Sequence, residues 1–439
     1  MKYFIKSEFG ELLDLAMHLK EEGNEVVFAT NHEYCKIGEG ILKHDCKWWN
    51  YMGKDYIFIV DGCEDGNFQD WMRSQGELVF GGCEMGDKLE NDRQLGQKLF
   101  KSAGFYQPES KNFKEIDDAI EFIHENKERR WILKQNGDAP KSINHMGKFD
   151  NNEDMLFHLQ SLKKRWNETM YGKFDCDLME IVEGLEVACS AFFNGTEFMK
   201  NKDGKVVGFL NFEEKKECDG GTGETTGEMG TTFLGTTEDN KMFADIMMRP
   251  KVIAILKKIN FRGVFDINCI KTKQGMVALE ATSRFGIPTT SYTFMEGLKT
   301  PAGKLIEAVA KGEDMPIEIR EGVGMVMCVV GKPYPVEVDL DGEATSQGEK
   351  LWILNNKKPI KTFTDEQKKH IRLQNFFKDE DGSFYVATKN GYLLTVTGKG
   401  KTIEDTRHAL IEYIKENIYI SGMKYRTDIG KRLEDKLKI

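Results

Sequence analysis

The stretch that decides the fold of this 439-residue chain reads Val277-Ala278-Leu279-Glu280-Ala281-Thr282-Ser283-Arg284-Phe285-Gly286-Ile287-Pro288. Its first residues are apolar, which predicts a buried strand, and Gly286 and Pro288 predict a turn directly after it. Such a strand holds the carboxylate of Glu280 at a fixed place. Mg²⁺ prefers oxygen ligands and is usually shared between one or two carboxylates and nucleotide phosphates, so this carboxylate is well placed to bind it. Arg284 can then form a bidentate pair with a phosphate or a substrate carboxylate.

A second strand is predicted shortly before the first. Residues 263–270 have a strand pattern, and a turn at residues 272–275 joins the two strands. We therefore expect a hairpin that brings Asp266 close to Glu280. If the register of the hairpin shifts, Asn268 takes the place of Asp266 beside Glu280.

Composition and charge are those of a large soluble enzyme. With 40% hydrophobic and 31% charged residues, the chain can form two or three domains with sizeable cores. A net charge of −10 makes a nucleic-acid partner unlikely in general, although a local basic groove stays open, because affinity for nucleic acid comes from Lys and Arg that neutralise phosphates. The nine cysteines are odd in number and form no Cys-x-x-Cys pair, which indicates a reducing compartment.

Apolar runs long enough for a signal peptide or a membrane span are missing from the sequence. The N-terminal run from Met1 to Ile5 is too short for a signal peptide, and no apolar stretch reaches 18 residues. We therefore expect a cytoplasmic protein that is not inserted in a membrane.

Hydrophobic periodicity predicts a doubly wound α/β domain over residues 1–104. A strand at residues 3–5, a helix at residues 8–22 and a strand at residues 25–29 form a βαβ unit. Strand patterns at residues 56–60 and 78–81 extend the parallel sheet. Further domains are predicted over residues 105–185, 186–315 and 316–439.

Three separated motifs resemble one family and occur in its order. The hairpin resembles the metal-binding hairpin of ATP-grasp ligases, and residues 283–288 are similar to the Cys-Arg-Phe-Gly-Asp-Pro segment of glycinamide ribonucleotide synthetases (phosphoribosylamine-glycine ligases). Residues 219–230 resemble the acidic, glycine-rich loop of that family, which ends in Gly-Gly-Met-Gly. Residues 425–430 resemble its C-terminal Arg-Lys-Asp-Ile-Gly signature. The resemblance spans nearly the whole chain, and three ordered motifs are more specific than one.

The resemblance implies an ATP-grasp fold made of α/β and α+β domains. Residues 1–104 would hold the amine substrate, and residues 105–185 would be the lid and hinge of the nucleotide site. Residues 186–315 would form the catalytic sheet with the metal hairpin, and residues 316–439 would form a C-terminal α+β domain.

The resemblance also assigns nucleotide-binding residues. Arg93 and Lys134 would contact the phosphates, and the backbone of Glu180, Ile181 and Val182 would pair with adenine. Glu186 would accept hydrogen bonds from the ribose. Each assignment has an alternative without a ligand. Arg93 can be an ordinary surface residue and Lys134 a solvated lysine at a strand edge. Residues 180–186 can be a half-exposed strand that alternates apolar and acidic residues.

The metal ligands implied are Asp266, Glu280 and Thr282, and the catalytic groups are Arg284 and Lys134, with Asp219 orienting an amine or a metal. Thr282 stands where the family has an asparagine, and its hydroxyl is a weaker ligand for Mg²⁺. The alternative for Asp266 and Glu280 is that they are ordinary acids at strand ends. The alternative for the glycine-rich stretch is a plain flexible loop. Residues 135–142 replace the loop that covers the phosphates and keep few glycines.

The activity implied is that of an ATP-dependent carboxylate-amine ligase of purine biosynthesis. With Mg²⁺ (or Mn²⁺), the γ-phosphoryl group of ATP would pass to a carboxylate, and an amine would attack the resulting acyl phosphate, giving an amide, ADP and phosphate. The partners would be a small carboxylate, such as glycine or another amino acid, and an amine. The chain would be a monomer or a small homo-oligomer.

The N-terminal loops depart from the family. Residues 6–11 and 61–65 stand where the family holds the phosphoribosyl group, and they carry acids that repel phosphate. A diverged ligase that joins an amino acid to another amine is therefore an alternative. A nucleotide-binding protein without turnover is a third possibility, favoured only by Thr282 and the loop at residues 135–142.

Overall fold

The computed structural model describes residues 1–31, 34–135, 144–166, 173–286, 288, 290–335 and 345–437. These residues form two compact units. The first contains Met1–Ala103, Glu186–Cys269 and Ala278–Ile439, and the second contains Gly104–Leu185 and Ile270–Val277. The chain therefore passes from the first unit into the second and back twice.

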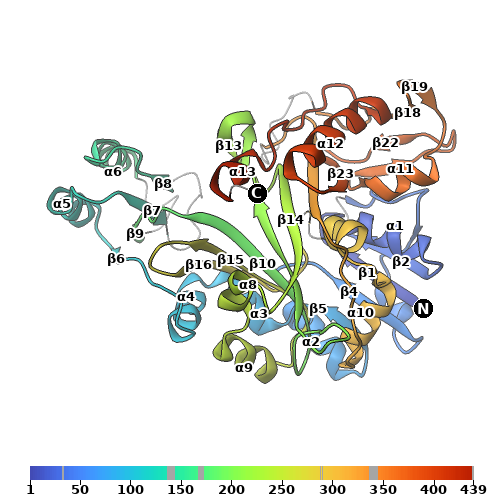
Figure 1. Cartoon of the computed structure of the whole chain (residues 1–439), viewed down its shortest axis with the longest axis horizontal. Helices are drawn as coiled ribbons and strands as arrows, with labels where there is room; N and C mark the ends of the chain where they lie inside the picture. Colours follow the sequence, from blue (N-terminus) through green and yellow to red (C-terminus); the bar gives the residue numbers. More distant parts are fainter. Residues whose placement is uncertain are drawn as a thin grey trace. The chain divides into compact units, whose positions relative to one another are not determined.

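The first unit begins with a parallel sheet, as the sequence predicts. β1 (Lys2–Ser7) lies between β2 (Glu25–Thr30) and β4 (Tyr56–Val60), and β4 pairs with β5 (Leu78–Gly81) (Figure 1). The short β3 (Lys43–His44) extends the sheet beside β2. The helices of this region are α1 (Leu13–Glu21), α2 (Gly66–Ser74), α3 (Glu84–Asn91) and α4 (Arg93–Ser102).

Helix α1 begins five residues later than the sequence pattern predicts. Gly10 has a φ of +83°, a left-handed conformation that does not occur inside a right-handed α-helix. The amide of Leu13 donates to the carbonyl of Gly10 (3.1 Å), and the amide of Leu12 donates to Oγ of Ser7 (3.1 Å). Residues 8–12 therefore form a turn, and the helix starts after it.

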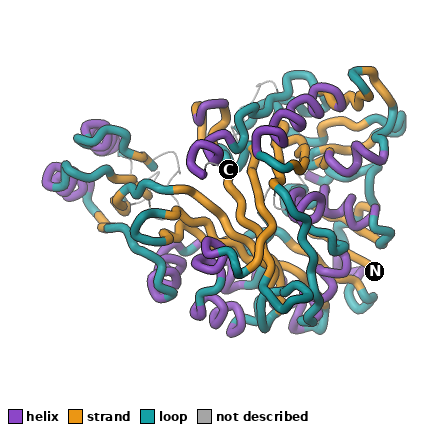
Figure 2. The backbone as a smooth tube through the Cα atoms, in the orientation of Figure 1, coloured by secondary structure: helices purple, strands orange, loops and turns teal. Residues whose placement is uncertain are grey.

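One long sheet of the first unit joins the parallel strands to antiparallel ones. Among the described residues its order is β20-β23-β17-β14-β11-β10-β15-β5-β4-β1-β2-β3, with β16 paired to β15. Figure 2 draws the strands of the chain in orange. The middle strands are β10 (Leu185–Asn194), β11 (Val207–Glu213), β14 (Gly230–Thr237), β15 (Arg262–Lys271) and β16 (Met276–Thr282). The predicted hairpin is confirmed as β15 and β16.

Shorter elements connect these strands. They are β12 (Lys216–Cys218), η4 (Asp219–Gly221), β13 (Thr222–Thr225), α8 (Lys241–Met247) and α9 (Pro250–Lys258). After the hairpin come a π-helix, η5 (Ser291–Gly297), and α10 (Ala302–Lys311).

The C-terminal part of the first unit completes the long sheet. β17 (Val323–Val330), β23 (Tyr392–Gly400) and β20 (Ile371–Leu373) pair antiparallel, and α12 (Ile403–Asn417) and α13 (Lys431–Leu437) follow. A smaller sheet has the order β19-β18-β22-β21, with β24 beside β18. Its strands are β18 (Lys350–Asn355), β19 (Lys358–Ile360), β21 (Phe376–Lys378), β22 (Phe384–Val386) and β24 (Ile418–Tyr419), and α11 (Asp365–His370) precedes β20.

The second unit is an antiparallel sheet with two helices. The sheet has the order β6-β9-β7-β8, and its core includes Trp131, Leu133 and Leu178. Its elements are β6 (Ser110–Phe113), α5 (Ile116–Glu125), β7 (Trp131–Gln135), β8 (His145–Met146), α6 (Glu153–Arg165) and β9 (Cys176–Glu180). Across the described part of both units, none of the helices combines the length and apolar character that a membrane span requires.

Candidate functional site

Arg284 is held by a carboxylate that the sequence analysis did not identify. It lies just after β16, and its Nε and Nη2 atoms donate to Oε1 of Glu90 on α3 at 3.2 Å and 2.9 Å. The amide of Ser283 donates to the other oxygen of Glu90 (3.4 Å). Burial alone lowers the pKa of Arg284, but Glu90 and nearby groups outweigh it and hold the pKa above its ordinary value. The guanidinium is therefore charged and fixed in direction.

A small cavity of about 50 Å³ gathers several of the predicted residues in the first unit. Asp266 reaches it from β15, Thr282 from the end of β16, and Arg284 from the turn that follows. The rest of the lining comprises Asn211, Glu213, Val264, Asn268 and Gly286. The hairpin and β11 therefore bring Asp266, a carboxylate suited to binding a metal ion, and Arg284 to one cavity.

Carboxylates around this cavity are crowded. Burial raises the pKa of Asp266 well above its ordinary value, and the charges of Glu213 and Glu280 raise it further. Burial also raises the pKa of Glu213, which the ammonium of Lys215 at 2.9 Å opposes. Lys215 also lies 3.6 Å from Glu186 and 4.0 Å from Glu280. A bound cation would neutralise part of the negative charge of these carboxylates.

Oxygen atoms at the cavity also suit a hard cation. Oδ1 of Asn211 and Oδ1 of Asn268 are buried and have no hydrogen-bond partner among the described residues. Within those same residues, no group of three or more His, Cys, Asp or Glu side chains is arranged to hold a metal ion. The donor set therefore fits Mg²⁺ that arrives with nucleotide phosphates, since such an ion needs only one or two protein carboxylates.

Glu280 occupies the exposed side of the hairpin. Its side chain is 56% exposed, and Oε1 accepts a hydrogen bond from Nδ2 of Asn268 (3.2 Å). Both candidates for the second metal ligand, Asp266 and Asn268, line the cavity. The choice between them stays a prediction.

Asp219 does not line this cavity; it joins the glycine-rich loop to the C-terminal motif. Its carboxylate accepts hydrogen bonds from the amide (2.9 Å) and the hydroxyl of Thr427. The amide of Gly220 donates to Oδ2 of Asp428 (2.7 Å), and Arg426 holds the same carboxylate at 2.8 and 2.9 Å. Two of the motifs singled out in the sequence thus bind each other.

The other predicted nucleotide residues lie in different elements. Arg93 is the first residue of α4, and Glu186 lies near the start of β10 in the first unit. In the second unit, Lys134 is half-buried in β7, opposite Asp177 of β9. Residues 136–143, which contain most of the segment compared with the phosphate-covering loop, lie outside the described residues.

The predicted hinge follows the end of β9 in the second unit. The amide of Glu180 donates to the carbonyl of Glu109 (2.8 Å), and the amide of Ile181 donates to the carbonyl of Arg130 (2.8 Å). Of these three described hinge residues, Val182 alone has an amide that makes no hydrogen bond within the described chain.

Acidic side chains of the N-terminal loops lie near Arg284. Asp61 is 5% exposed and accepts hydrogen bonds from Oγ of Ser7 (2.5 Å) and the amide of Glu8 (2.9 Å). Burial raises the pKa of Asp61 to about 6 and that of Glu11 to about 7, while the nearby charge of Arg284 opposes both shifts. The loops therefore present more acids than bases, with Lys6 paired to Asp65.

Comparison with known proteins finds similar sequences. Residues 91–290 match the family model described as phosphoribosylglycinamide synthetase, ATP-grasp (A) domain. A phosphoribosylamine–glycine ligase of Helicobacter pylori is 24% identical over 375 residues, covering 83% of this chain and 79% of the relative.

Solved structures share the fold over nearly the whole chain. A phosphoribosylamine–glycine ligase of Thermotoga maritima superposes with a TM-score of 0.67 at 19% identity, covering 98% of this chain and all of that one. A biotin carboxylase domain of Hydrogenobacter thermophilus in complex with MgADP has a TM-score of 0.62 at 12% identity, covering 96% of this chain and 91% of that one. The ATP-grasp fold predicted from the sequence is confirmed.

Proposed function

We propose that this ATP-grasp protein, similar to the phosphoribosylamine–glycine ligases, is an ATP-dependent ligase that joins a carboxylate to an amine and releases ADP and phosphate. The observation that carries the proposal is the cavity where Asp266, Thr282 and Arg284 meet. An activity in purine biosynthesis is the first reading, because the relatives are named for the ligation of phosphoribosylamine and glycine.

Arg284 is proposed to bind the substrate carboxylate or the phosphoryl group that is transferred to it. Its charge is assured by Glu90, and a guanidinium held on one side can still offer N–H groups on the other. Because Glu90 fixes the guanidinium in advance, little reorganisation is needed when negative charge develops.

The metal site is proposed to use Asp266 and Glu280, with Asn268 or Thr282 adding an uncharged oxygen. Unpartnered oxygens and crowded acids at the cavity support this assignment. When bound, Mg²⁺ would neutralise phosphate charge during phosphoryl transfer. Lys215, which already balances Glu213 and Glu186, is proposed to keep the remaining acids ionised.

The nucleotide-binding residues are proposed from the family resemblance. Lys134 and Arg93 are assigned to the phosphates by the family resemblance, and Glu186 to the ribose. At the hinge, the amide of Val182 is the one still able to donate to an adenine nitrogen, while Glu180 and Ile181 contribute through backbone and shape. Asp219 is proposed to orient the glycine-rich loop through Thr427.

The N-terminal loops support a second candidate reaction, in which the amine substrate differs from phosphoribosylamine. Glu11 and Asp61 lie near Arg284 in the loops where the family resemblance puts the phosphoribosyl group. Buried acids repel a phosphate and attract a cationic amine. A ligase that joins an amino acid to a cationic amine is therefore the second candidate. Loss of turnover is less favoured, because Glu280 and Arg284 are both retained.

The test is ADP release with glycine and freshly generated phosphoribosylamine, beside a panel of amino acids and cationic amines, with product masses measured. Turnover with phosphoribosylamine in the ordinary enzymatic range of roughly 1 to 10³ per second establishes the first reading. Release of ADP only with another amine establishes the second. If no combination releases ADP from a protein that binds Mg-ATP, the ligase proposal is wrong.

A further inference from the structure

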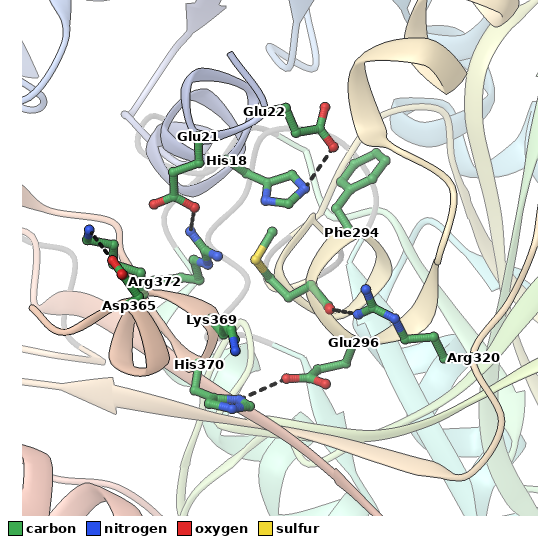
Figure 3. A pocket seen from close by; sticks show the side chains of 12 residues that line it. His18, Glu21, Glu22, Phe294, Glu296, Arg320, Asp365, Lys369, His370 and Arg372 are labelled. Carbon is green, nitrogen blue, oxygen red and sulfur yellow. Dashed lines mark hydrogen bonds and ion pairs between the residues drawn. The ribbon is translucent and has the colours of Figure 1, made fainter. Parts of the chain in front are cut away.

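A second and much larger cavity lies in the first unit, away from the proposed ligase residues. Its volume is about 680 Å³, within the range of roughly 300 to 1,000 Å³ that small-molecule sites occupy. Its walls come from α1, the π-helix η5, α11 and β20 (Figure 3). None of its lining residues belongs to the set assigned to ATP, metal or the reacting carboxylate.

Arg372 is the most unusual residue of this cavity. Its side chain is only 3% exposed, and Nη1 donates to Oε2 of Glu21 (3.1 Å) (Figure 3). Its Nε is buried and has no hydrogen-bond partner among the described residues. Buried donors in native proteins are nearly always satisfied, so an unpartnered one at a cavity wall indicates a missing acceptor. A ligand oxygen in the cavity would provide it.

The wall acids Glu22 and Glu296 contact other donors, and neither accepts a hydrogen bond from Nε of Arg372 among the described residues. Glu22 accepts hydrogen bonds from the amides of Ala302 (2.7 Å) and Gly303 (2.9 Å). Glu296 faces Nδ1 of His370 at 3.0 Å and accepts from the hydroxyl of Thr397 (3.1 Å). These contacts direct both carboxylates to donors other than Nε of Arg372.

The wall also carries cationic side chains besides Arg372. Arg320 donates to the carbonyl of Met295, which is neutral, so this hydrogen bond does not balance the positive charge of the guanidinium. Nε2 of His18 lies 3.3 Å from Glu22, so this ring is already engaged with an acid of the wall. Lys368 and Lys369 stand at the rim, where they pair with exposed acids of their own helix. The unpartnered Nε of Arg372, together with the charge of Arg320, therefore favours a ligand that accepts hydrogen bonds and carries negative charge.

Part of the lining is apolar. Phe294 and Met295 of the π-helix are 4% and 8% exposed and face the cavity. A flat or apolar body can pack against them while its anionic group reaches Arg372. We propose that this cavity binds a small organic anion, a carboxylate or a phosphate monoester on an apolar or aromatic body, with Arg372 as its anchor.

Phenyl phosphate and benzoate are the probes, and benzylamine of the same ring size is the cationic control. Each is titrated calorimetrically into the full-length protein. At least one anion is expected to bind with one-to-one stoichiometry, and benzylamine is not. Preference for phenyl phosphate over benzoate identifies a phosphate ligand, and the reverse preference identifies a carboxylate.

Variants assign the binding to this cavity. Arg372→Gln should weaken the anion roughly tenfold or more, the usual loss with a charge-assisted hydrogen bond. Glu21→Gln should tighten it roughly two- to fivefold, because it removes a partly exposed negative charge that competes with the anion for Arg372. Arg407→Gln removes another buried arginine, paired with Glu434, and should leave binding unchanged.

Three results overturn the proposal. The first is failure of both anions to bind at millimolar concentration. The second is unchanged affinity in Arg372→Gln, or loss of affinity in Arg284→Gln, which would move the anion to the ligase site. The third is binding of benzylamine in preference to the anions. If Arg372→Gln fails to fold, the test rests on Glu21→Gln. In that case, an anion affinity that does not increase in Glu21→Gln contradicts the anchor role of Arg372.

Discussion

Replacing Glu90 by Gln tests whether Arg284 of the proposed ligase site must be fixed in position before the substrate binds. Glu90 accepts two hydrogen bonds from Arg284 and one from the amide of Ser283. The two side chains are 14% and 27% exposed, so the pair is largely buried. A fully buried pair that loses one partner costs about 3–5 kcal/mol, and exposure together with the amide that replaces the carboxylate reduces this to about 1–2 kcal/mol.

The effect on activity should be larger than the effect on folding suggests. A misplacement of about 1 Å near the reacting atoms can lower the rate about 100-fold, so kcat is expected to fall roughly 10- to 100-fold in Glu90→Gln. Glu90→Asp, which keeps the charge on a shorter side chain, should recover part of the loss. Glu84→Gln is the matched control, because Glu84 is on the same helix and pairs with Lys88 on the surface.

Steady-state ADP release and thermal unfolding are measured on the same preparations. A positioning role lowers kcat with little change in the KM for ATP, whereas a purely structural role lowers the melting temperature and leaves kcat of the folded fraction unchanged. Normal kcat in well-folded Glu90→Gln would refute the reasoning.

Three further predictions concern binding, metal and pH. Mg-ATP should raise the melting temperature, because a ligand that binds only the native state stabilises it; no rise at saturation would contradict nucleotide binding. Glu280→Gln should lower kcat about 10²- to 10³-fold in a well-folded protein, and near-normal activity would mean that the metal is held elsewhere. The raised pKa of Glu11, about 7, means that the folded state binds an extra proton between the ordinary pKa and 7. This contribution to stability is therefore full below pH 4.5 and is lost as pH rises to 7, and Glu11→Gln should flatten that decline in unfolding experiments.

Local patterns predicted the hairpin and the neighbourhood of several candidate site residues. Alternating apolar residues and a turn place β15 beside β16, and this is enough to bring Asp266, Thr282 and Arg284 to one cavity. The parallel strands of the first unit follow from the same kind of signal.

Contacts between distant segments could not be predicted in this way. Glu90 lies 194 residues before Arg284, and no periodicity of α3 indicates that one acid of its surface is buried against an arginine. Glu213 and Lys215 join the site because β11 lies beside β10 in the sheet. The late start of α1 depends on the positive φ of Gly10, since a glycine permits that conformation without requiring it.

The contact of Asp219 with Thr427 has a consequence for synthesis of the protein. The two residues are 208 positions apart, as are Gly220 and Asp428. At about 5–20 residues per second, a ribosome needs roughly 10–40 s to reach the C-terminal motif after it has made the glycine-rich loop. During that interval the loop lacks the hydrogen bonds that the C-terminal motif supplies, and we expect it to be more open to proteases. Synonymous codons that slow translation in the last third of the message would lengthen this exposed period.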